Sequence, residues 1–205
     1  MTTNSFESDF EALSEAQERM YAHIGRYLSR AAQLDSMVSN LVAVFVNPLD
    51  PDKVRPLLEK PGAEEKLRLL SKVLPDEISD GHVLIKQLRN INESRNRLAH
   101  SAVDSFNDYF AGSSDVGGKV ELNRYGRDPL EFDLSKLPKL ELDQQVVIHV
   151  MYAVLMGHVE SRMNSAPMTT VADMIALEGR RKESLFFIPE TLHYAQAMFA
   201  ADKSK

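Results

Sequence analysis

Cysteine is absent from this chain of 205 residues. Without a thiol, neither a disulfide framework nor a thiolate metal site can form. This absence is consistent with a reducing compartment, and we expect a cytoplasmic protein. The N-terminal stretch is acidic and lacks a basic segment followed by an apolar run, so we expect no signal peptide.

Long apolar runs are also missing. The longest apolar-rich stretch, VVIHVMYAVLMGHV at 146–159, carries two histidines and is too short to span a membrane. We interpret it as part of a buried helix. The chain is therefore not expected to be a membrane protein.

The chain lacks an excess of basic charge, because its formal net charge is −6. That value argues against a protein that coats nucleic acid through phosphate neutralisation. A local basic site is still compatible with it. Residues 81–100 contain four lysine or arginine residues against the single acid Glu93, so this segment is basic within an acidic chain.

Apolar positions that recur every three or four residues predict a mainly all-α chain. The exception is KVELNRYGRDPLEFDL, which alternates apolar and polar residues around a turn and predicts a β-hairpin at 119–134. We expect a bundle of four longer helices with this hairpin inserted before the last of them. The predicted helices are 8–19, 20–46, 51–60, 63–74, 77–101, 142–164, 170–178 and 189–201.

Three segments follow from this pattern. Residues 1–19 are expected to form an N-terminal leader helix, 20–164 the helical bundle with its hairpin, and 165–205 small accessory helices with a polar tail.

The segment NESRNRLAHS at 92–101 departs from the pattern of its helix. Arg95 lies on the apolar stripe, between Ile91 and Leu98. A guanidinium on a buried face is costly unless it is paired or reaches water. Asn96 and His100 are four residues apart and share a face. The ordinary alternative is a helix that ends in cations, which the negative C-terminal end of the helix dipole favours.

The RNRLAH segment resembles the R-x4-H motif of the HEPN superfamily, in which asparagine frequently follows the arginine. The earlier long helix, with IGRYLSRAAQLDSMVSNLV, is similar to the first helix of many bacterial HEPN proteins. The resemblance covers about residues 20–164.

The resemblance implies a helical bundle that dimerises so that two motifs face one cleft. Many HEPN proteins are metal-independent endoribonucleases, and others only bind partners. Arg95 and His100 would be the catalytic pair, and Asn96 would position them. Some toxin-type members carry a tyrosine two residues after the histidine, where this chain has Ala102, so that mode of regulation is not expected here.

The chemistry of RNA cleavage suits these residue types. The 2′-OH attacks the neighbouring phosphorus, histidine transfers protons near neutral pH, and arginine stabilises the added charge on the phosphate. One chain offers one motif histidine, whereas a symmetric homodimer offers two. The products would carry a 2′,3′-cyclic phosphate, and DNA would not be cut because it lacks the 2′-OH.

Further cations are candidates for contact with the RNA backbone, although each alone is an ordinary surface charge. Arg89, Arg97 and Lys86 lie on the helix of the motif. Lys119, Arg124 and Arg127 lie in the predicted hairpin.

No metal or cofactor site is predicted. His149 and His158 are nine residues apart on one helix and face opposite sides. The sequence contains no phosphate-binding loop, no nucleophile elbow and no H-E-x-x-H zinc motif.

Three functions remain open. The first is a HEPN-type endoribonuclease, such as a toxin or phage-defence effector restrained by an antitoxin or another regulatory protein. The second is a non-catalytic HEPN-like dimer that binds a partner protein or a nucleotide. The third is a helical structural protein.

Overall fold

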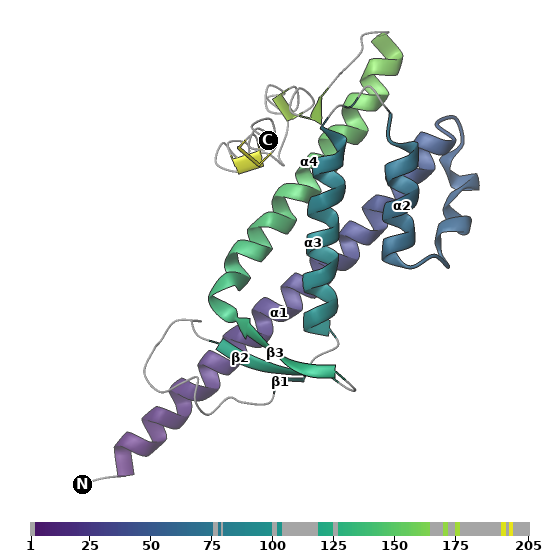
Figure 1. Cartoon of the computed structure of the whole chain (residues 1–205). Helices are drawn as coiled ribbons and strands as arrows, with labels where there is room; N and C mark the ends of the chain where they lie inside the picture. Colours follow the sequence, from purple (N-terminus) through teal and green to yellow (C-terminus); the bar gives the residue numbers. More distant parts are fainter. Residues whose placement is uncertain are drawn as a thin grey trace. The chain divides into compact units, whose positions relative to one another are not determined.

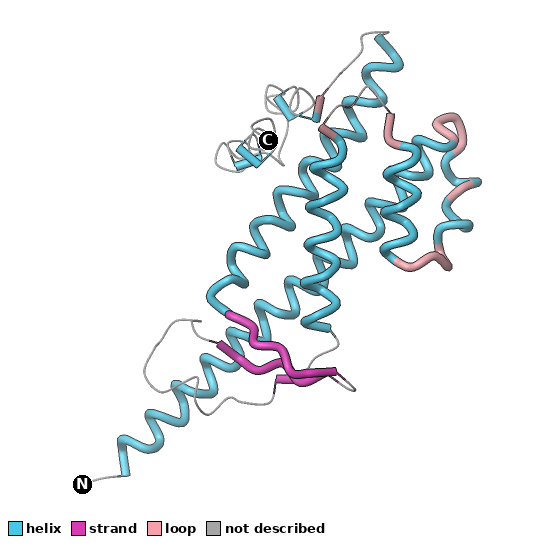
Figure 2. The backbone as a smooth tube through the Cα atoms, in the orientation of Figure 1, coloured by secondary structure: helices cyan, strands magenta, loops and turns pink. Residues whose placement is uncertain are grey.

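A computed structural model describes residues 3–75, 78, 80–99, 102–103, 119–124, 127–164, 170–171, 175–176, 194–195 and 197–198. The described residues are mostly helical, which confirms the prediction of a mainly helical chain. Figure 1 labels the elements, and Figure 2 separates helices from strands by colour.

The first helix, α1, runs without interruption over Thr3–Val46. The sequence pattern had indicated two helices here, at 8–19 and 20–46. They are one helix because no proline falls between their predicted ends, and a glycine inside a helix costs only about 1 kcal/mol relative to alanine. The helix ends before Asn47 and Pro48, where the Asn47 side chain accepts a hydrogen bond from the amide of Asp50 at 3.3 Å.

Three further α-helices come later in the part of the chain that the structure describes. They are α2 (Ala63–Val73), α3 (Gly81–Ala99) and α4 (Leu137–Asn164). Helix α4 begins five residues before its predicted start at 142, because Pro138 occupies its first turn, where a missing amide hydrogen costs nothing. Helix α3 begins at Gly81 rather than 77, and a Cβ at that glycine would overlap the side chain of Leu74.

Short elements complete the described chain. Two 3-10 helices, η1 (Pro51–Lys53) and η2 (Arg55–Leu58), occupy the region predicted as one helix at 51–60. A third, η3 (Leu134–Lys136), precedes α4. The helices predicted at 170–178 and 189–201 lie largely outside the described residues.

Three antiparallel strands form one small sheet in the order β1-β2-β3 (Figure 2). They are β1 (Ala102–Val103), β2 (Lys119–Arg124) and β3 (Arg127–Asp133). In β2 and β3, Val120 pairs with Phe132 and Leu122 with Leu130. Strand β1 follows α3 closely in the chain and pairs Ala102 with Asn123.

The chain divides into two compact units. One comprises Met1–Ala31 and Glu93–Leu142, and the other comprises Ala32–Asn92 and Asp143–Lys205. We call them the motif unit and the core unit. Helices α1, α3 and α4 each contribute residues to both units.

The core unit holds the larger apolar cluster, to which all four α-helices contribute. Among its most deeply buried members are Leu41, Leu70, Leu84 and Met151. Polar groups support this packing. The ammonium of Lys66, which is largely buried, lies 2.6 Å from a carboxylate oxygen of Asp35.

The motif unit has a smaller apolar cluster. It joins Met20 and Tyr27 of α1, Leu98 of α3 and Leu137 of α4, with Phe132 of β3 packed against them. The end of the helix that carries the motif is therefore fixed against the other two long helices of this unit.

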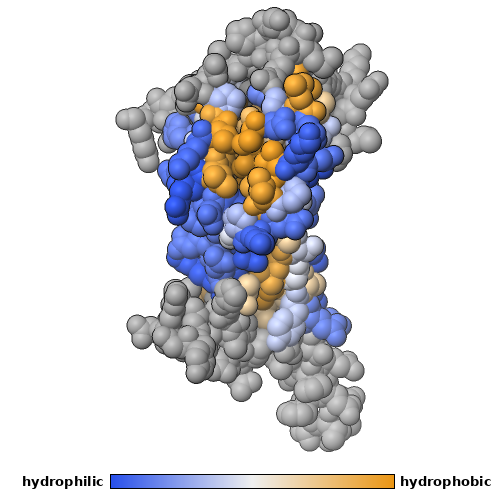
Figure 3. Space-filling model, turned by 90° about the vertical axis from the view of Figure 1, so that its right-hand side faces the viewer, coloured by the Kyte–Doolittle hydropathy of each residue, from blue (hydrophilic) through white to orange (hydrophobic). Residues whose placement is uncertain are grey.

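Several large apolar side chains are exposed to solvent. Leu49 is 97% exposed and Leu57 is 73% exposed, and both lie in the segment that follows α1. Figure 3 shows that apolar residues gather on part of the face it displays, with hydrophilic residues around them. None of the described helices is both long and apolar enough to cross a membrane.

His149 of α4 is 8% exposed, and burial lowers its pKa below the ordinary value of about 6.5. The unfolded chain therefore takes up a proton at this histidine before the folded chain does as the pH falls. The contribution of His149 to the free energy of unfolding is therefore fully present above about pH 6.5 and is lost progressively below it.

We expect His149→Gln to flatten this dependence, because the substituted side chain does not titrate. Urea unfolding at pH 7.5, 6.5 and 5.5, for wild type and variant, measures it. Equal slopes of unfolding free energy against pH in both proteins would contradict the prediction.

Candidate functional site

The last turns of α3 hold the Arg95 and Asn96 side chains in direct contact. A terminal guanidinium nitrogen of Arg95 donates a hydrogen bond to the amide oxygen of Asn96, at 2.9 Å. The stripe around Arg95 is buried as predicted, since Ile91 is 5% exposed and Leu98 is 6% exposed. Arg95 itself is only partly buried, so its charge reaches water and avoids the cost of full burial.

His100 lies outside the described residues, as does Ser101. The described elements on either side of it are α3, which ends at Ala99, and β1, which begins at Ala102.

Two of the predicted RNA-binding cations have acidic partners. In the motif unit, Arg97 pairs with Glu93, one helical turn earlier. In the core unit, Nε of Arg89 lies 3.2 Å from a carboxylate oxygen of Glu64 on α2. Exposed ion pairs of this kind contribute only about 0–1 kcal/mol, so a phosphate can compete for either arginine.

The remaining predicted contacts are divided between the two units, and Arg124 pairs with Arg127 across β2 and β3. Lys86 is exposed on the part of α3 that belongs to the core unit, so the structure does not group it with the motif. Lys119 and Arg124 lie at the two ends of β2, and Arg127 begins β3.

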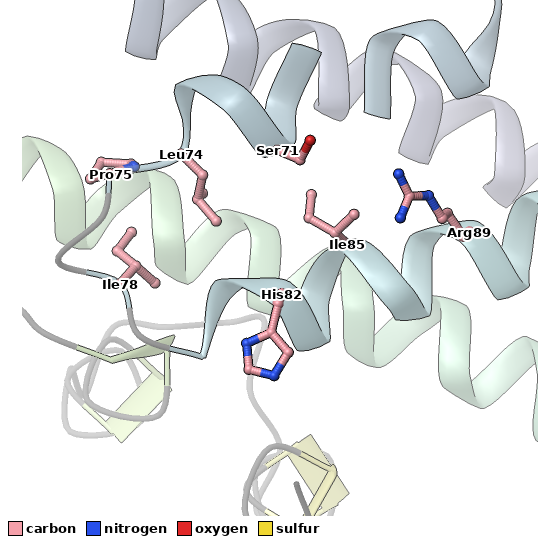
Figure 4. A pocket seen from close by; sticks show the side chains of 7 residues that line it. All are labelled: Ser71, Leu74, Pro75, Ile78, His82, Ile85 and Arg89. Atoms are coloured by element: carbon pink, nitrogen blue, oxygen red, sulfur yellow. The ribbon is translucent and has the colours of Figure 1, made fainter. Parts of the chain in front are cut away.

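A hollow of about 360 Å³ lies in the core unit, between the end of α2 and the beginning of α3 (Figure 4). Leu74, Ile78 and Ile85 give it an apolar lining, and Ser71, Pro75, His82 and Arg89 complete it. Among the predicted site residues that the structure describes, Arg89 borders this hollow, whereas Arg95 and Asn96 do not.

One charged cluster in the described chain was not predicted from the sequence. In the motif unit, His23, Arg26 and Arg30 of α1 all contact Glu141 of α4. Nδ1 of His23 lies 2.6 Å from one carboxylate oxygen of Glu141. Nε of Arg26 and a terminal nitrogen of Arg30 lie 3.5 and 3.4 Å from the other oxygen. We call these four residues the Glu141 cluster.

Part of this cluster was visible in the sequence. His23, Arg26 and Arg30 are spaced by three and four residues, which places them on one face of a helix. The acid that gathers them is more than 100 residues away in the chain, and no local pattern identifies it.

Among the residues that the structure describes, no group of three or more histidine, cysteine, aspartate or glutamate side chains could hold a metal ion. His158, one of the two histidines considered above, packs edge-on against the ring of Phe45, with ring centres 4.7 Å apart.

Comparison with protein-family models, with curated proteins and with solved structures finds no match to this chain.

Proposed function

We propose that this chain is a metal-independent endoribonuclease of the HEPN type that acts as a homodimer. The observation that carries the proposal is the side chain of Arg95, which interrupts an otherwise buried stripe, stays partly exposed and is held by Asn96. A guanidinium fixed in this way costs little further entropy when it binds a phosphate.

In the proposed reaction, a ribose 2′-OH attacks the adjacent phosphorus and loses its proton to one His100. The bond from phosphorus to the 5′-oxygen breaks, and the leaving oxygen takes a proton from the second His100 of the dimer. Arg95 from each subunit stabilises the charge that develops on the phosphate. The products are a 2′,3′-cyclic phosphate and a free 5′-OH.

The biological role that suits this chemistry is a cytoplasmic toxin or phage-defence effector, restrained by an antitoxin or another regulatory protein. Uncontrolled RNA cleavage would harm the cell that makes the enzyme, so a partner that covers the motif is part of the proposal.

The experiment that tests the activity is incubation of purified protein with a mixed RNA, with and without EDTA. We expect cleavage that EDTA does not inhibit, because histidine and arginine supply the chemistry. The fragments should carry cyclic phosphate ends, and a DNA of the same sequence should stay intact. Cleavage that requires a divalent ion, or cleavage of DNA, would refute the proposed mechanism.

A second candidate is a non-catalytic dimer that binds a partner protein or a nucleotide at the same motif. Two observations favour it. The net charge is −6, and both Arg89 and Arg97 already have acidic partners, which weakens the attraction for a long RNA. Stable binding of a nucleotide or a partner protein, without RNA cleavage, would support this candidate.

A further inference from the structure

The Glu141 cluster contains more positive charge than its acid can neutralise. Two arginines, which remain charged at any physiological pH, and one histidine surround a single carboxylate. This surplus occurs in a chain whose overall charge is −6. An ion pair that served only to join α1 to α4 would need one cation.

The burial of Glu141, Arg26 and Arg30 shows which charge faces water. The side chain of Glu141 is 12% exposed, whereas that of Arg26 is 49% and that of Arg30 is 32% exposed. The acid therefore lies beneath the cations. A molecule that approaches from solvent meets the guanidinium groups before it meets the carboxylate.

The two guanidinium groups retain donors for another acceptor. Their contacts with the Glu141 carboxylate are 3.5 and 3.4 Å long, beyond the range of about 2.7–2.9 Å of a strong charge-assisted hydrogen bond. Within the described part of the chain, their hydrogen bonds and ion pairs go to Glu141 alone. Each guanidinium carries five N–H donors, so most of them are available to a ligand.

The ligand that fits this arrangement is a phosphodiester. A planar guanidinium matches two phosphate oxygens, and residues four apart on a helix have Cβ atoms about 5–6 Å apart. Two arginines at this spacing can therefore contact neighbouring oxygens of a phosphate backbone.

The motif unit brings the cluster and the Arg95 motif together. Tyr27, on the helix of the cluster, and Leu98, three residues after Arg95, pack in the same apolar core. We propose that Arg26, Arg30 and His23, arranged around Glu141, form a binding site for the backbone of single-stranded RNA in the same unit as Arg95. This inference rests on the proposed function, because the bound strand is the RNA that the proposed enzyme cleaves.

The test measures binding rather than cleavage. A 2′-O-methyl RNA, which cannot be cut by 2′-OH attack, is labelled with a fluorophore and titrated with the protein at 25–200 mM salt. For single-stranded nucleic acid, the slope of log affinity against log salt changes by about 0.7 for each phosphate contact. We expect Arg26→Gln with Arg30→Gln to weaken binding and to flatten the slope by about 1.4.

The matched control is Arg55→Gln. Arg55 has a similar exposure, 51%, and one ion pair, with Asp52 in the core unit. We expect Arg55→Gln to leave the slope of log affinity against log salt unchanged. The proposed site would be overturned if Arg55→Gln changed the slope as much as the double substitution of Arg26 and Arg30 does. It would also be overturned if neither variant changed the slope.

Glu141→Gln is the second variant, which removes the competing carboxylate and keeps the cations. It should tighten RNA binding, because the phosphate no longer competes with a fixed negative charge. Weaker binding by this variant would assign the cluster a purely structural role and overturn the proposal.

Cleavage and the salt slope distinguish failure of the nuclease proposal from failure of the binding-site proposal. If the protein cleaves RNA and the double substitution of Arg26 and Arg30 leaves the salt slope unchanged, the binding site is refuted and the nuclease proposal stands. Protein that never cleaves, yet shows the flatter slope, refutes the nuclease and leaves the binding site.

Discussion

Replacement of His100 with alanine is expected to lower the rate of RNA cleavage by at least about 10²–10⁴-fold, the usual contribution of general acid–base catalysis. In a homodimer the substitution removes both proton-transfer groups at once, so the loss should be at the upper end of that range. The measurement is a single-turnover time course with end-labelled RNA. Circular dichroism of the variant establishes that it still folds.

The matched control is His82→Ala, which removes an exposed imidazole from α3 in the core unit. It should cleave at the wild-type rate. A folded His100→Ala protein that cleaves as fast as wild type would remove His100 from the mechanism, and the proposed function with it.

Leu84→Ala is expected to lower the free energy of unfolding by about 2–5 kcal/mol. Leu84 of α3 is fully buried, at 0% exposed, in the apolar cluster of the core unit. Truncation removes buried methyl groups and leaves a cavity that close packing cannot fill. Urea unfolding followed by circular dichroism measures the loss.

Leu49→Ala makes the same chemical change where the side chain is 97% exposed. It should shift the free energy of unfolding by no more than about 0.5 kcal/mol. A similar loss for both variants would show that the two leucines have similar surroundings in solution, contrary to their different burial in the structure.

The helices were predictable because they depend on local spacing. The apolar stripe of α3 could be identified from residues three and four apart, and so could the unusual position of Arg95 on it. The continuity of α1 was missed, because residues 8–19 are more acidic in composition than residues 20–46. Composition does not end a helix, whereas a break needs a residue that opposes helical geometry.

The charged contacts also divide into local ones, which the sequence can indicate, and distant ones, which it cannot. The pairing of Glu93 with Arg97 connects residues four apart and is accessible to sequence reasoning. The partner of Arg89 is 25 residues away, and Glu141 lies more than 100 residues from the three side chains that it gathers. Such contacts arise from tertiary packing, so the sequence could not show that the predicted RNA contacts are partly neutralised. The identification with HEPN proteins stays a prediction.

The exposed leucines affect how a measured oligomeric state of the protein should be interpreted. Leu49 and Leu57 are exposed apolar side chains of the core unit, whereas Arg95 and Asn96 belong to the motif unit. If two copies associated through these exposed leucines, the measured mass would be that of a dimer. Such a dimer would have no role in RNA cleavage. Ultracentrifugation of a chain with Leu49→Ser and Leu57→Ser separates the two sources, because a dimer that persists in that chain is held by other residues.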